Sequence, residues 1–376
     1  MVMQDEKRNA WRTVLFFYTI MMILCIADLI QKDIFFSESE NRILAEKPEI
    51  SVKTLLSGEY MEDYETYLND QFVSRNTWIT LKTGMDMLLQ KKEINGVYLA
   101  DDDYLIEQHL DSDFPEETIV KKLDLLNKLV QQYPQTQVLI APTADNILTE
   151  KLPFQAPYFD QSVFLARVKE MIGEEHVIDV FPTLSEHAQE DIYYKTDHHW
   201  TTRGAYYAYL EWTKFNGFEP VDYSLDTLQA VTSDFEGTLQ SKLNMPVKGE
   251  EIHVFPQTLT APVKLKYDMM METESFYESK YLSGKNKYGY FLDDNHGLIE
   301  ITTDGPAKKQ LFIIKDSYAN TMIPLLAEHY GKIYVLDLRY FNGKLFPFME
   351  SLDEYGNMDV LLLYNCVHFI SDFRYF

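Results

Sequence analysis

The hydrophobic positions begin with one long uninterrupted run near the N-terminus. Residues 14–27 (VLFFYTIMMILCIA) hold no charged side chain, and the stretch over residues 13–30 is about as long as the shortest helices that cross a bilayer. A helix in the core of a globular protein has a polar face, and this segment has none. The pattern predicts a transmembrane helix over residues 13–30.

Charge next to this segment predicts its orientation. Three cationic side chains precede it: Lys7, Arg8 and Arg12. Cations favour the cytoplasmic side, so residues 1–12 are expected in the cytoplasm and everything after residue 30 outside it. The alternative is a cleaved signal peptide, with Cys25 and Ala27 as the small residues of the cleavage site. Either way, the rest of the chain is expected to work outside the cytoplasm, at the cell membrane if the anchor is kept.

Residues 31–90 are interpreted as a tether and a helical stem. The tether is polar and irregular as far as residue 57. Apolar residues then recur every three or four positions, which places them on one side of a helix: Tyr60, Tyr64, Tyr67, Leu68 and Phe72. Such a stripe is typical of packing.

Residues 91–376 are expected to form one α/β domain. Two short strands flank the acidic turn Asp101–Asp103. Amphipathic segments then alternate with short apolar runs, which predicts layers of helices on a largely parallel sheet. The first expected helix is capped by Asp113, has Pro115 in its first turn and continues through residue 133. The other expected helices cover 160–173, 203–217 and 319–329, and the expected strands cover 137–142, 176–180, 310–316, 332–338 and 358–365.

One part of this domain, about 221–305, has a different pattern. Segments with strand character are separated there by Pro, Gly and Asn, for example VTSDF, HVFPQ, VKLKYD, SFYES and LIEITTD. We interpret this region as a β-rich insertion.

Composition narrows the class of protein. With 376 residues, 46% hydrophobic and 25% charged, the chain is neither disordered nor fibrous as a whole. Its 59 acidic and 34 basic residues give a net charge of −25, so it repels polyanions and nucleic acid is not an expected partner. Of its two cysteines, Cys25 lies in the hydrophobic segment, so no internal disulfide is expected.

A dense group of reactive side chains lies in the segment YKTDHHWTT, residues 194–202. An imidazole acts as a general base when a carboxylate holds its far nitrogen, because this contact fixes the tautomer and stabilises the imidazolium. Residues two apart in a turn can make that contact, which favours Asp197 with His199 and leaves His198 as a possible alternative base. The alternative is that this segment has only a structural role, as a polar turn that caps the helix after Thr202.

Ser317 is the candidate nucleophile. It follows a buried strand and precedes a helix, so its hydroxyl is expected at the carboxyl edge of the sheet, where sites of open α/β sheets form. The amides of Ser317 and Tyr318 could donate to an oxyanion there. A plain N-cap serine is the alternative. Together with Asp197 and His199, this serine supplies the three parts of a nucleophilic triad.

These motifs resemble the DHHW protein family. The residues that carry the resemblance are Asp197–Trp200, Lys315–Asn320, Glu40–Arg42, Asn69–Phe72 with Arg75, and Asp337–Tyr340. The family is similar to the SGNH-hydrolase-like proteins of bacterial polysaccharide O-acetylation, including those that acetylate alginate. The resemblance implies an SGNH-hydrolase-like layered sheet with flanking helices.

The resemblance also implies roles for individual residues. Ser317 would be the nucleophile, with His199 as base and Asp197 as its carboxylate, in the reverse of the usual SGNH order. The usual oxyanion blocks are not recognisable, and Asn365, after the last predicted strand, is an oxyanion candidate beside Tyr318. No cofactor and no metal ion are implied.

The implied activity is that of a membrane-anchored enzyme on the outer face of the membrane. It would move acetyl or similar acyl groups onto or off a cell-surface or exported polysaccharide. The expected partner is a multi-spanning membrane O-acyltransferase that delivers the acyl group across the bilayer. The sequence leaves the glycan, the acyl donor and the direction of transfer open.

Two other functions stay open at this point. DHH phosphoesterases bind metal through an Asp-His-His motif and further aspartates, which Asp101–Asp103 could mimic; Trp200 and Ser317 would have no role there. A non-catalytic protein that binds glycan or organises a polysaccharide-modifying complex is the other alternative, because family membership does not prove turnover.

Overall fold

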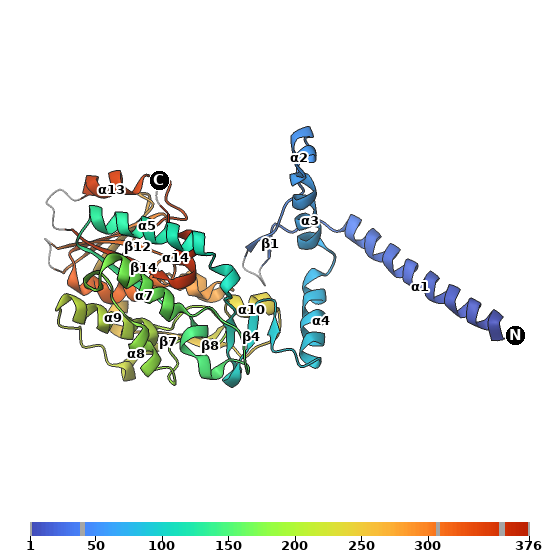
Figure 1. Cartoon of the computed structure of the whole chain (residues 1–376), viewed down its shortest axis with the longest axis horizontal. Helices are drawn as coiled ribbons and strands as arrows, with labels where there is room; N and C mark the ends of the chain where they lie inside the picture. Colours follow the sequence, from blue (N-terminus) through green and yellow to red (C-terminus); the bar gives the residue numbers. More distant parts are fainter. Residues whose placement is uncertain (1, 38–41, 306–308, 353–357, 375–376) are drawn as a thin grey trace. The chain divides into compact units, whose positions relative to one another are not determined.

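The computed structural model describes residues 2–37, 42–305, 309–352 and 358–374 (Figure 1). The chain divides into two compact units. One consists of Met1–Gln90 with Leu243–Met245, and the other of Lys91–Lys242 with Pro246–Phe376. We describe each unit by itself.

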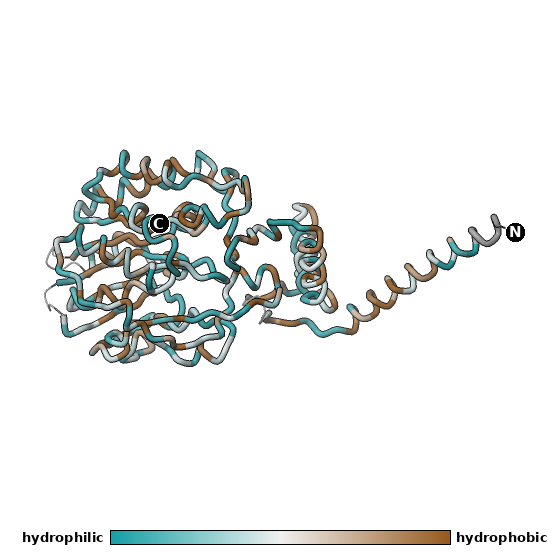
Figure 2. Tube along the Cα trace, turned by 90° about the horizontal axis from the view of Figure 1, so that it is seen from below, coloured by the Kyte–Doolittle hydropathy of each residue, from teal (hydrophilic) through white to brown (hydrophobic). Residues whose placement is uncertain are grey.

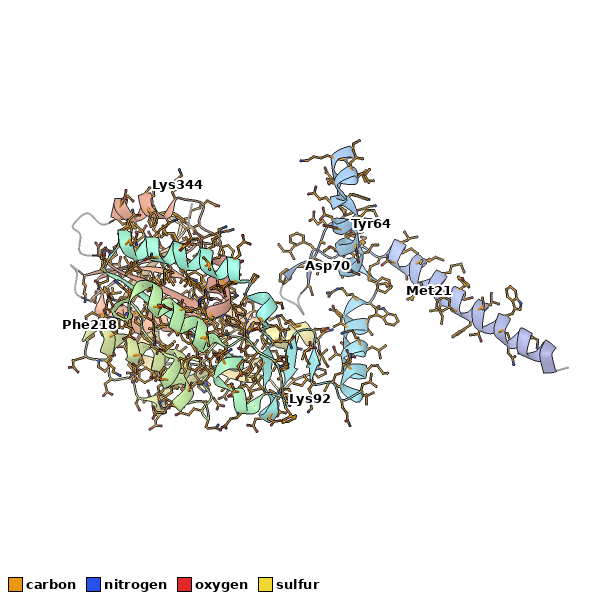
Figure 3. The ribbon with its side chains drawn as sticks, in the orientation of Figure 1. Met21, Tyr64, Asp70, Lys92, Phe218 and Lys344 are labelled. Carbon is orange, nitrogen blue, oxygen red and sulfur yellow. The ribbon has the colours of Figure 1, made fainter. Side chains whose placement is uncertain are left out.

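The first unit begins with the long helix α1 (Val2–Ile30). Within it, Arg8–Ile30 is long and apolar enough to cross a membrane, by length and composition. Hydrophobic residues run along much of this helix (Figure 2), and side chains such as that of Met21 project outward from it (Figure 3). The helix is therefore compatible with a signal anchor.

The rest of the first unit is helical, with a small hairpin. It contains α2 (Val52–Ser57), α3 (Glu59–Gln71), α4 (Arg75–Leu88), β1 (Phe36–Ser37) and β2 (Arg42–Ile43). Neighbouring rings of the predicted stripe meet on α3. The ring centroid of Tyr64 lies 5.7 Å from that of Tyr60 and 5.9 Å from that of Tyr67. The buried Gln71 donates to the carbonyls of Ile34 and Ala45. These two contacts bind the segment after α1 to α3.

The second unit is built on a seven-stranded sheet in the order β10-β9-β11-β13-β12-β14-β6. The strands are β6 (Thr136–Ala141), β9 (Val263–Tyr267), β10 (Met271–Thr273), β11 (Leu298–Thr303), β12 (Gln310–Lys315), β13 (Lys332–Asp337) and β14 (Met358–Asn365). Strands β13, β12, β14 and β6 are parallel, whereas β11, β9 and β10 are antiparallel. The predicted α/β class is confirmed, but the sheet is mixed.

The region predicted as an insertion supplies these antiparallel strands. Its first two strands, β7 (Gln229–Phe235) and β8 (Glu250–Val254), form a separate ribbon, but β9, β10 and β11 extend the main sheet. The predicted β-rich insertion is therefore rich in strands, and its second half belongs to the main sheet. Local hydrophobic alternation identifies a strand but not the strand that it pairs with.

Helices cover both faces of the sheet (Figure 1). Alternate residues of each central strand enter different cores: Leu311 and Ile313 face one core, Phe312 and Ile314 the other. The first core also receives side chains of α6 (Ala144–Ile147), α8 (Phe181–Glu186), α9 (Thr202–Asn216) and α12 (Ala319–Leu326). The second receives side chains of α5 (Glu116–Gln132), α7 (Gln161–Ile172), α13 (Leu345–Leu352) and α14 (Cys366–Asp372).

Several local predictions can be compared directly with this unit. The strands on either side of the acidic turn are confirmed as β4 (Val97–Leu99) and β5 (Leu105–Glu107). They pair with each other, and β4 also pairs with β3 (Glu93–Ile94), in a small three-stranded sheet. The segments 176–180 and 275–279 are not strands; each makes only an isolated bridge, through Val177 and Tyr277. Both are short apolar runs whose backbone finds a single partner residue.

Candidate active site

Ser317 lies at the carboxyl edge of the sheet. Strand β12 ends at Lys315, the chain turns through Asp316, Ser317 and Tyr318, and α12 begins at Ala319. The amide of Asn320 donates to the Ser317 carbonyl, which closes the turn. The serine is 6% exposed. The predicted strand-to-helix corner therefore exists, and it presents this hydroxyl beside the end of β14.

The motif Asp197–Trp200 forms a tight loop beside this corner. Tyr193 and Trp200 form an antiparallel bridge, and the amide of Tyr194 donates to the carbonyl of His199. Thr201 caps the following helix, because its side chain accepts a hydrogen bond from the Gly204 amide at the start of α9. The loop thus has a fixed backbone on both sides.

Trp200 connects the motif to the serine corner. Its ring is fully buried, and Nε1 donates to the Tyr318 carbonyl and to Thr321 Oγ1, at 2.9 Å each. The two segments are more than a hundred residues apart in sequence. The indole is therefore a direct structural link between the candidate base and the candidate nucleophile.

The structure brings Asp197, His199 and Ser317 into one hydrogen-bonded chain. His199 Nδ1 lies 2.5 Å from Asp197 Oδ1, and His199 Nε2 lies 2.8 Å from Ser317 Oγ. All three residues are buried. Burial alone would raise the pKa of Asp197, but the neighbouring imidazoles and a hydrogen bond from Thr238 lower it overall. The carboxylate form is thus favoured, which is the form that holds an imidazole in place.

His198 occupies a different place. Its ring stacks on His199 with centroids 3.9 Å apart, and its Nδ1 lies 2.8 Å from Thr238 Oγ1. The Thr238 hydroxyl donates to Asp197, so it accepts from Nδ1–H of His198. Burial and the nearby His199 lower the pKa of His198 to about 3. His198 makes no hydrogen bond to Ser317 in the described part of the chain, so only His199 reaches the serine.

The two oxyanion candidates, Tyr318 and Asn365, differ in the hydrogen bonds that their N–H groups already make. The Tyr318 amide donates to Asp316 Oδ1 at 2.9 Å, so it is not free to donate to an oxyanion. Asn365 ends β14, the neighbour of β12, and its Oδ1 accepts the His368 amide at the start of α14. This cap fixes the orientation of the Asn365 amide group. Its Nδ2 lies 3.1 Å from His368 Nδ1, and among the described residues no carbonyl or carboxylate accepts the Nδ2 hydrogens.

One carboxylate–imidazole pair at the site was not predicted. Asp316, directly before the serine, accepts the amide of Asn365 at 2.9 Å and contacts His368 Nδ1 at 3.0 Å. Asp316 falls within the motif Lys315–Asn320, but the sequence has no local signal for its partner, because His368 is on α14, 52 residues later.

A second unpredicted cluster lies under the corner. The ammonium of the fully buried Lys315 donates to Asn295 and Asn320, and it lies 3.6 Å from Asp337. Arg339 forms a 2.6 Å ion pair with the same Asp337. The motif Asp337–Tyr340 therefore has a structural partner, since it neutralises the buried lysine at the end of the serine strand.

The region predicted as an insertion contributes two walls of the site. Tyr288 stacks on the face of His199 at 3.8 Å, and its hydroxyl donates to the Ser317 carbonyl at 3.1 Å. Thr238, at the start of α10 (Thr238–Leu243), holds Asp197 through its amide at 2.8 Å and its hydroxyl at 3.0 Å. Sequence reasoning missed both, because neither carries a motif.

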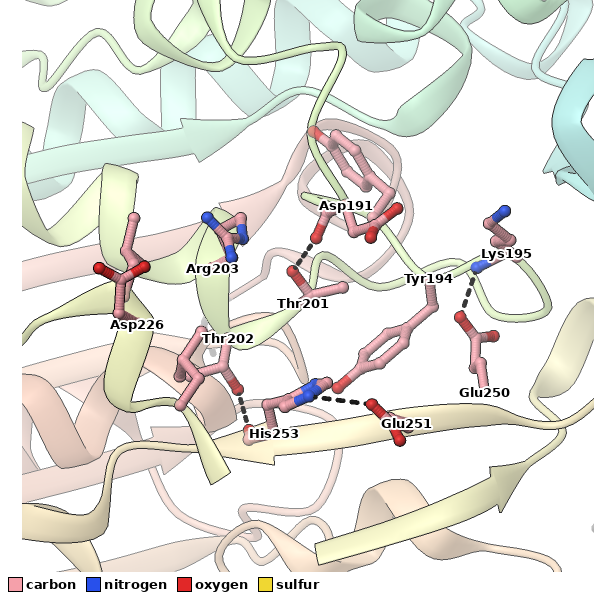
Figure 4. A pocket seen from close by; sticks show the side chains of 13 residues that line it. Asp191, Tyr194, Lys195, Thr201, Thr202, Arg203, Asp226, Glu250, Glu251 and His253 are labelled. Atoms are coloured by element: carbon pink, nitrogen blue, oxygen red, sulfur yellow. Dashed lines mark hydrogen bonds and ion pairs between the residues drawn. The ribbon is translucent and has the colours of Figure 1, made fainter. Parts of the chain in front are cut away.

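A cavity of about 470 Å³ adjoins the motif loop (Figure 4). Its lining includes residues on both sides of the loop, among them Tyr194 and Thr202, and Glu250 of β8. Glu250 accepts the amides of Lys195 and Thr196 at 2.8 Å each. The Glu250 carboxylate therefore fixes the backbone of the two residues that precede Asp197.

The donor atoms of Asp197, His198 and His199 lie within 4.8 Å of one another, close enough for a metal ion. However, Asp197 accepts hydrogen bonds from both His199 and Thr238, and both ring nitrogens of His199 have partners. Asp101–Asp103 form an exposed turn, where Asp102 pairs with Lys151. The arrangement of donors fits acid–base chemistry better than the predicted alternative of a metal site.

Comparison with known proteins identifies the family resemblance independently. Residues 163–336 match the family model described as DHHW protein, which confirms the predicted resemblance. A DHHW family protein from Eubacterium siraeum DSM 15702 has a similar structure, with 19% identity, coverage of 74% of this chain and 93% of that chain, and a TM-score of 0.61. No curated protein matches the chain.

Bacillus cereus PatB1 is also similar. One structure of it is 20% identical, covers 73% of this chain and 98% of its own, and has a TM-score of 0.58. A second, with a sulfonyl adduct, is 18% identical, covers 74% and 99%, and has a TM-score of 0.57. At these identities the likeness establishes a shared fold, and the predicted SGNH-hydrolase-like α/β class is confirmed.

Proposed function

We propose that this chain, with its DHHW match over residues 163–336, is an extracytoplasmic serine-dependent O-acyltransferase or esterase that acts on a polysaccharide. The observation that carries the proposal is the hydrogen-bonded chain from Asp197 through His199 to the Ser317 hydroxyl. A hydroxyl within 2.8 Å of a carboxylate-held imidazole is the arrangement that nucleophilic acyl transfer needs.

In the first half-reaction, Ser317 Oγ attacks the carbonyl carbon of the acyl donor while His199 Nε2 takes the hydroxyl proton. Asp197 stabilises the imidazolium that forms. The Oγ–carbon bond forms, the bond to the leaving oxygen breaks, and His199 returns the proton to that oxygen. The products are an acyl-serine and the protonated leaving group.

In the second half-reaction, His199 takes a proton from an acceptor hydroxyl, and the oxygen of that hydroxyl attacks the acyl carbon. The bond between the acyl carbon and Ser317 Oγ breaks, and His199 returns the proton to Ser317 Oγ. A sugar hydroxyl as acceptor makes the protein a transferase, and water makes it an esterase. Asn365 Nδ2 and the Ser317 amide, which makes no hydrogen bond to the described residues, are the proposed oxyanion donors.

The neutral state of His198 supports this mechanism. A second positive charge stacked 3.9 Å from His199 would oppose the imidazolium that each half-reaction forms. The pKa of about 3 keeps His198 uncharged at neutral pH. We therefore assign the base role to His199 and not to His198.

The proposed setting follows from α1 and from the family resemblance. The apolar helix would anchor the chain, with its N-terminus in the cytoplasm and the α/β unit outside. The acceptor would be a cell-surface or exported polysaccharide. A multi-spanning membrane O-acyltransferase would supply the acyl group from the cytoplasmic side.

The test is covalent labelling. The full chain in detergent is incubated with 4-nitrophenyl acetate or a sulfonyl fluoride, and peptides are analysed by mass spectrometry. We expect one adduct, on Ser317, in the presence of chelator, and none in Ser317→Ala. PatB1 has been solved with a sulfonyl adduct, which makes this reagent a suitable probe. Chelator-sensitive phosphate release would favour the phosphoesterase, and no adduct with no turnover would favour the scaffold.

A further inference from the structure

A second carboxylate–imidazole pair lies beside the catalytic one. Asp316 is fully buried and accepts the amides of Tyr318 on Oδ1 and of Asn365 on Oδ2, at 2.9 Å each. His368 Nδ1 lies 3.0 Å from the same Oδ2. His368 Nδ1 also lies 3.1 Å from Asn365 Nδ2, which can only donate. A carboxylate surrounded by donors is ionised and can only accept, so we assign the hydrogen on Nδ1 to the bond with Asp316, and the contact with Asn365 Nδ2 is then not a hydrogen bond.

The other nitrogen of His368 faces solvent. The side chain is 26% exposed, and Nε2 makes no hydrogen bond to the described residues. It is not among the buried unpartnered atoms either, so it is open to solvent. Burial alone would lower the pKa of His368, but the hydrogen bond and charge of Asp316 outweigh it and raise the pKa. Nε2 therefore tends to carry a hydrogen that it can donate.

Ring contacts connect His368 to His199 through His198. Its ring centroid lies 6.0 Å from that of His198, and the two rings are nearly perpendicular. His198 in turn stacks on His199. An acceptor hydroxyl has to reach Nε2 of His199 to lose its proton, so the acceptor sugar must bind next to this group of imidazoles.

We propose that His368 binds an oxygen of the acceptor sugar through Nε2 and thereby directs the acyl group to the sugar rather than to water. This inference rests on the proposed function, because it requires an acyl-serine. Asp316 is the positioning residue, since it fixes the ring through Nδ1 while its other contacts hold Tyr318 and Asn365. A sugar held in this way displaces the water that would otherwise hydrolyse the intermediate.

The experiment measures how the acyl-enzyme divides among acceptors. The full chain in detergent is acetylated with 4-nitrophenyl acetate. The first-turnover burst gives the acylation rate, and products are counted with methyl glycosides of glucose, galactose, mannose and N-acetylglucosamine as acceptors. Methanol is the comparison acceptor, because it is too small to need a binding contact.

The variants are His368→Ala and His368→Gln, with His187→Ala as matched control. His187 is also held by a carboxylate, with Nδ1 2.7 Å from Glu190 Oε1, and its side chain is 29% exposed, but it lies at the end of α8. We expect the burst rate and methanol transfer to stay within about twofold in all variants. The ratio of sugar transfer to hydrolysis should fall about 10- to 100-fold in His368→Ala, with a smaller fall in His368→Gln and none in His187→Ala.

Each other outcome decides against one of the two proposals. No burst in the wild type, with correctly folded protein by circular dichroism, refutes the proposed function. A normal burst with an unchanged sugar ratio in His368→Ala refutes the role of His368. A reduced burst in His368→Ala also refutes it, because His368 would then act in acylation. A wild type that acylates but transfers to none of the four glycosides better than to methanol refutes sugar selection.

Discussion

Trp200→Phe is the sharpest test of the link between the motif loop and the serine corner. The substitution keeps an aromatic ring but removes the Nε1 donor that contacts the Tyr318 carbonyl and Thr321 Oγ1. The lost hydrogen bond costs about 1 kcal/mol. The smaller ring leaves a cavity in a fully buried position, which costs about 1–3 kcal/mol more. We expect the free energy of unfolding to fall by about 2–4 kcal/mol.

The effect on activity separates this link from plain packing. A shift of about 1 Å between reacting groups can cost about 10²-fold in rate, and Trp200→Phe releases the segment that sets the distance between Ser317 and His199. Trp212→Phe is the control: Trp212 is equally buried, and its Nε1 donates to Gln137 at 3.1 Å. It lies on α9, about 15 Å along the helix axis from the first residue, Thr202, at about 1.5 Å per residue.

Both variants are measured by urea unfolding and by the acylation burst with 4-nitrophenyl acetate. We expect similar losses of stability, but an acylation rate that falls about 10²-fold only in Trp200→Phe. Equal activity of the two variants at equal stability would show that the indole fills space and does not position the serine.

Three further predictions concern single residues. Ser317→Ala and His199→Ala should each lower turnover at least about 10³-fold in the ester assay with the fold kept, and near-normal activity would remove that residue from the mechanism. His198→Gln should cost less than about tenfold, because His198 does not contact Ser317; a loss as large as that of His199→Ala would contradict the assignment of the base. Burial would lower the pKa of His109, but Asp145 and Glu107 raise it to about 10. The free energy with which charged His109 stabilises the fold is therefore fully present below about pH 6.5 and is lost as the pH rises through about 10. The difference in unfolding free energy between wild type and His109→Asn should therefore shrink over that range, and a constant difference would show that His109 is not charged.

Local sequence patterns were sufficient for the parts of the site that lie within one segment. Asp197 and His199 are two residues apart, so the turn alone brings their side chains together. Ser317 follows an apolar run, and the change from buried to polar residues marks the end of a strand. The four parallel strands were also predicted. Helices cover both faces of these strands, so each strand appears in the sequence as a continuous apolar run.

Partners that are distant in sequence were not predictable in this way. Thr238 reaches Asp197 across 41 residues, and His368 reaches Asp316 across 52. Hydrophobic periodicity predicts whether a residue is buried. It does not predict which distant residue that side chain contacts. For the same reason, the sequence does not show that β9 and β11 pair with the main sheet.

The antiparallel strands change how the site must be understood. Tyr288 comes from the loop before β11, and it covers one face of His199 while its hydroxyl holds the Ser317 carbonyl. Thr238 comes from the start of the same region and holds Asp197. Because β9 and β11 are hydrogen-bonded into the main sheet, this region has a fixed register relative to β13. His199 is therefore held by contacts from a region that pairs with the main sheet, and deletion of residues 221–305 should destroy the alignment of His199 even though Asp197, His199 and Ser317 are all retained.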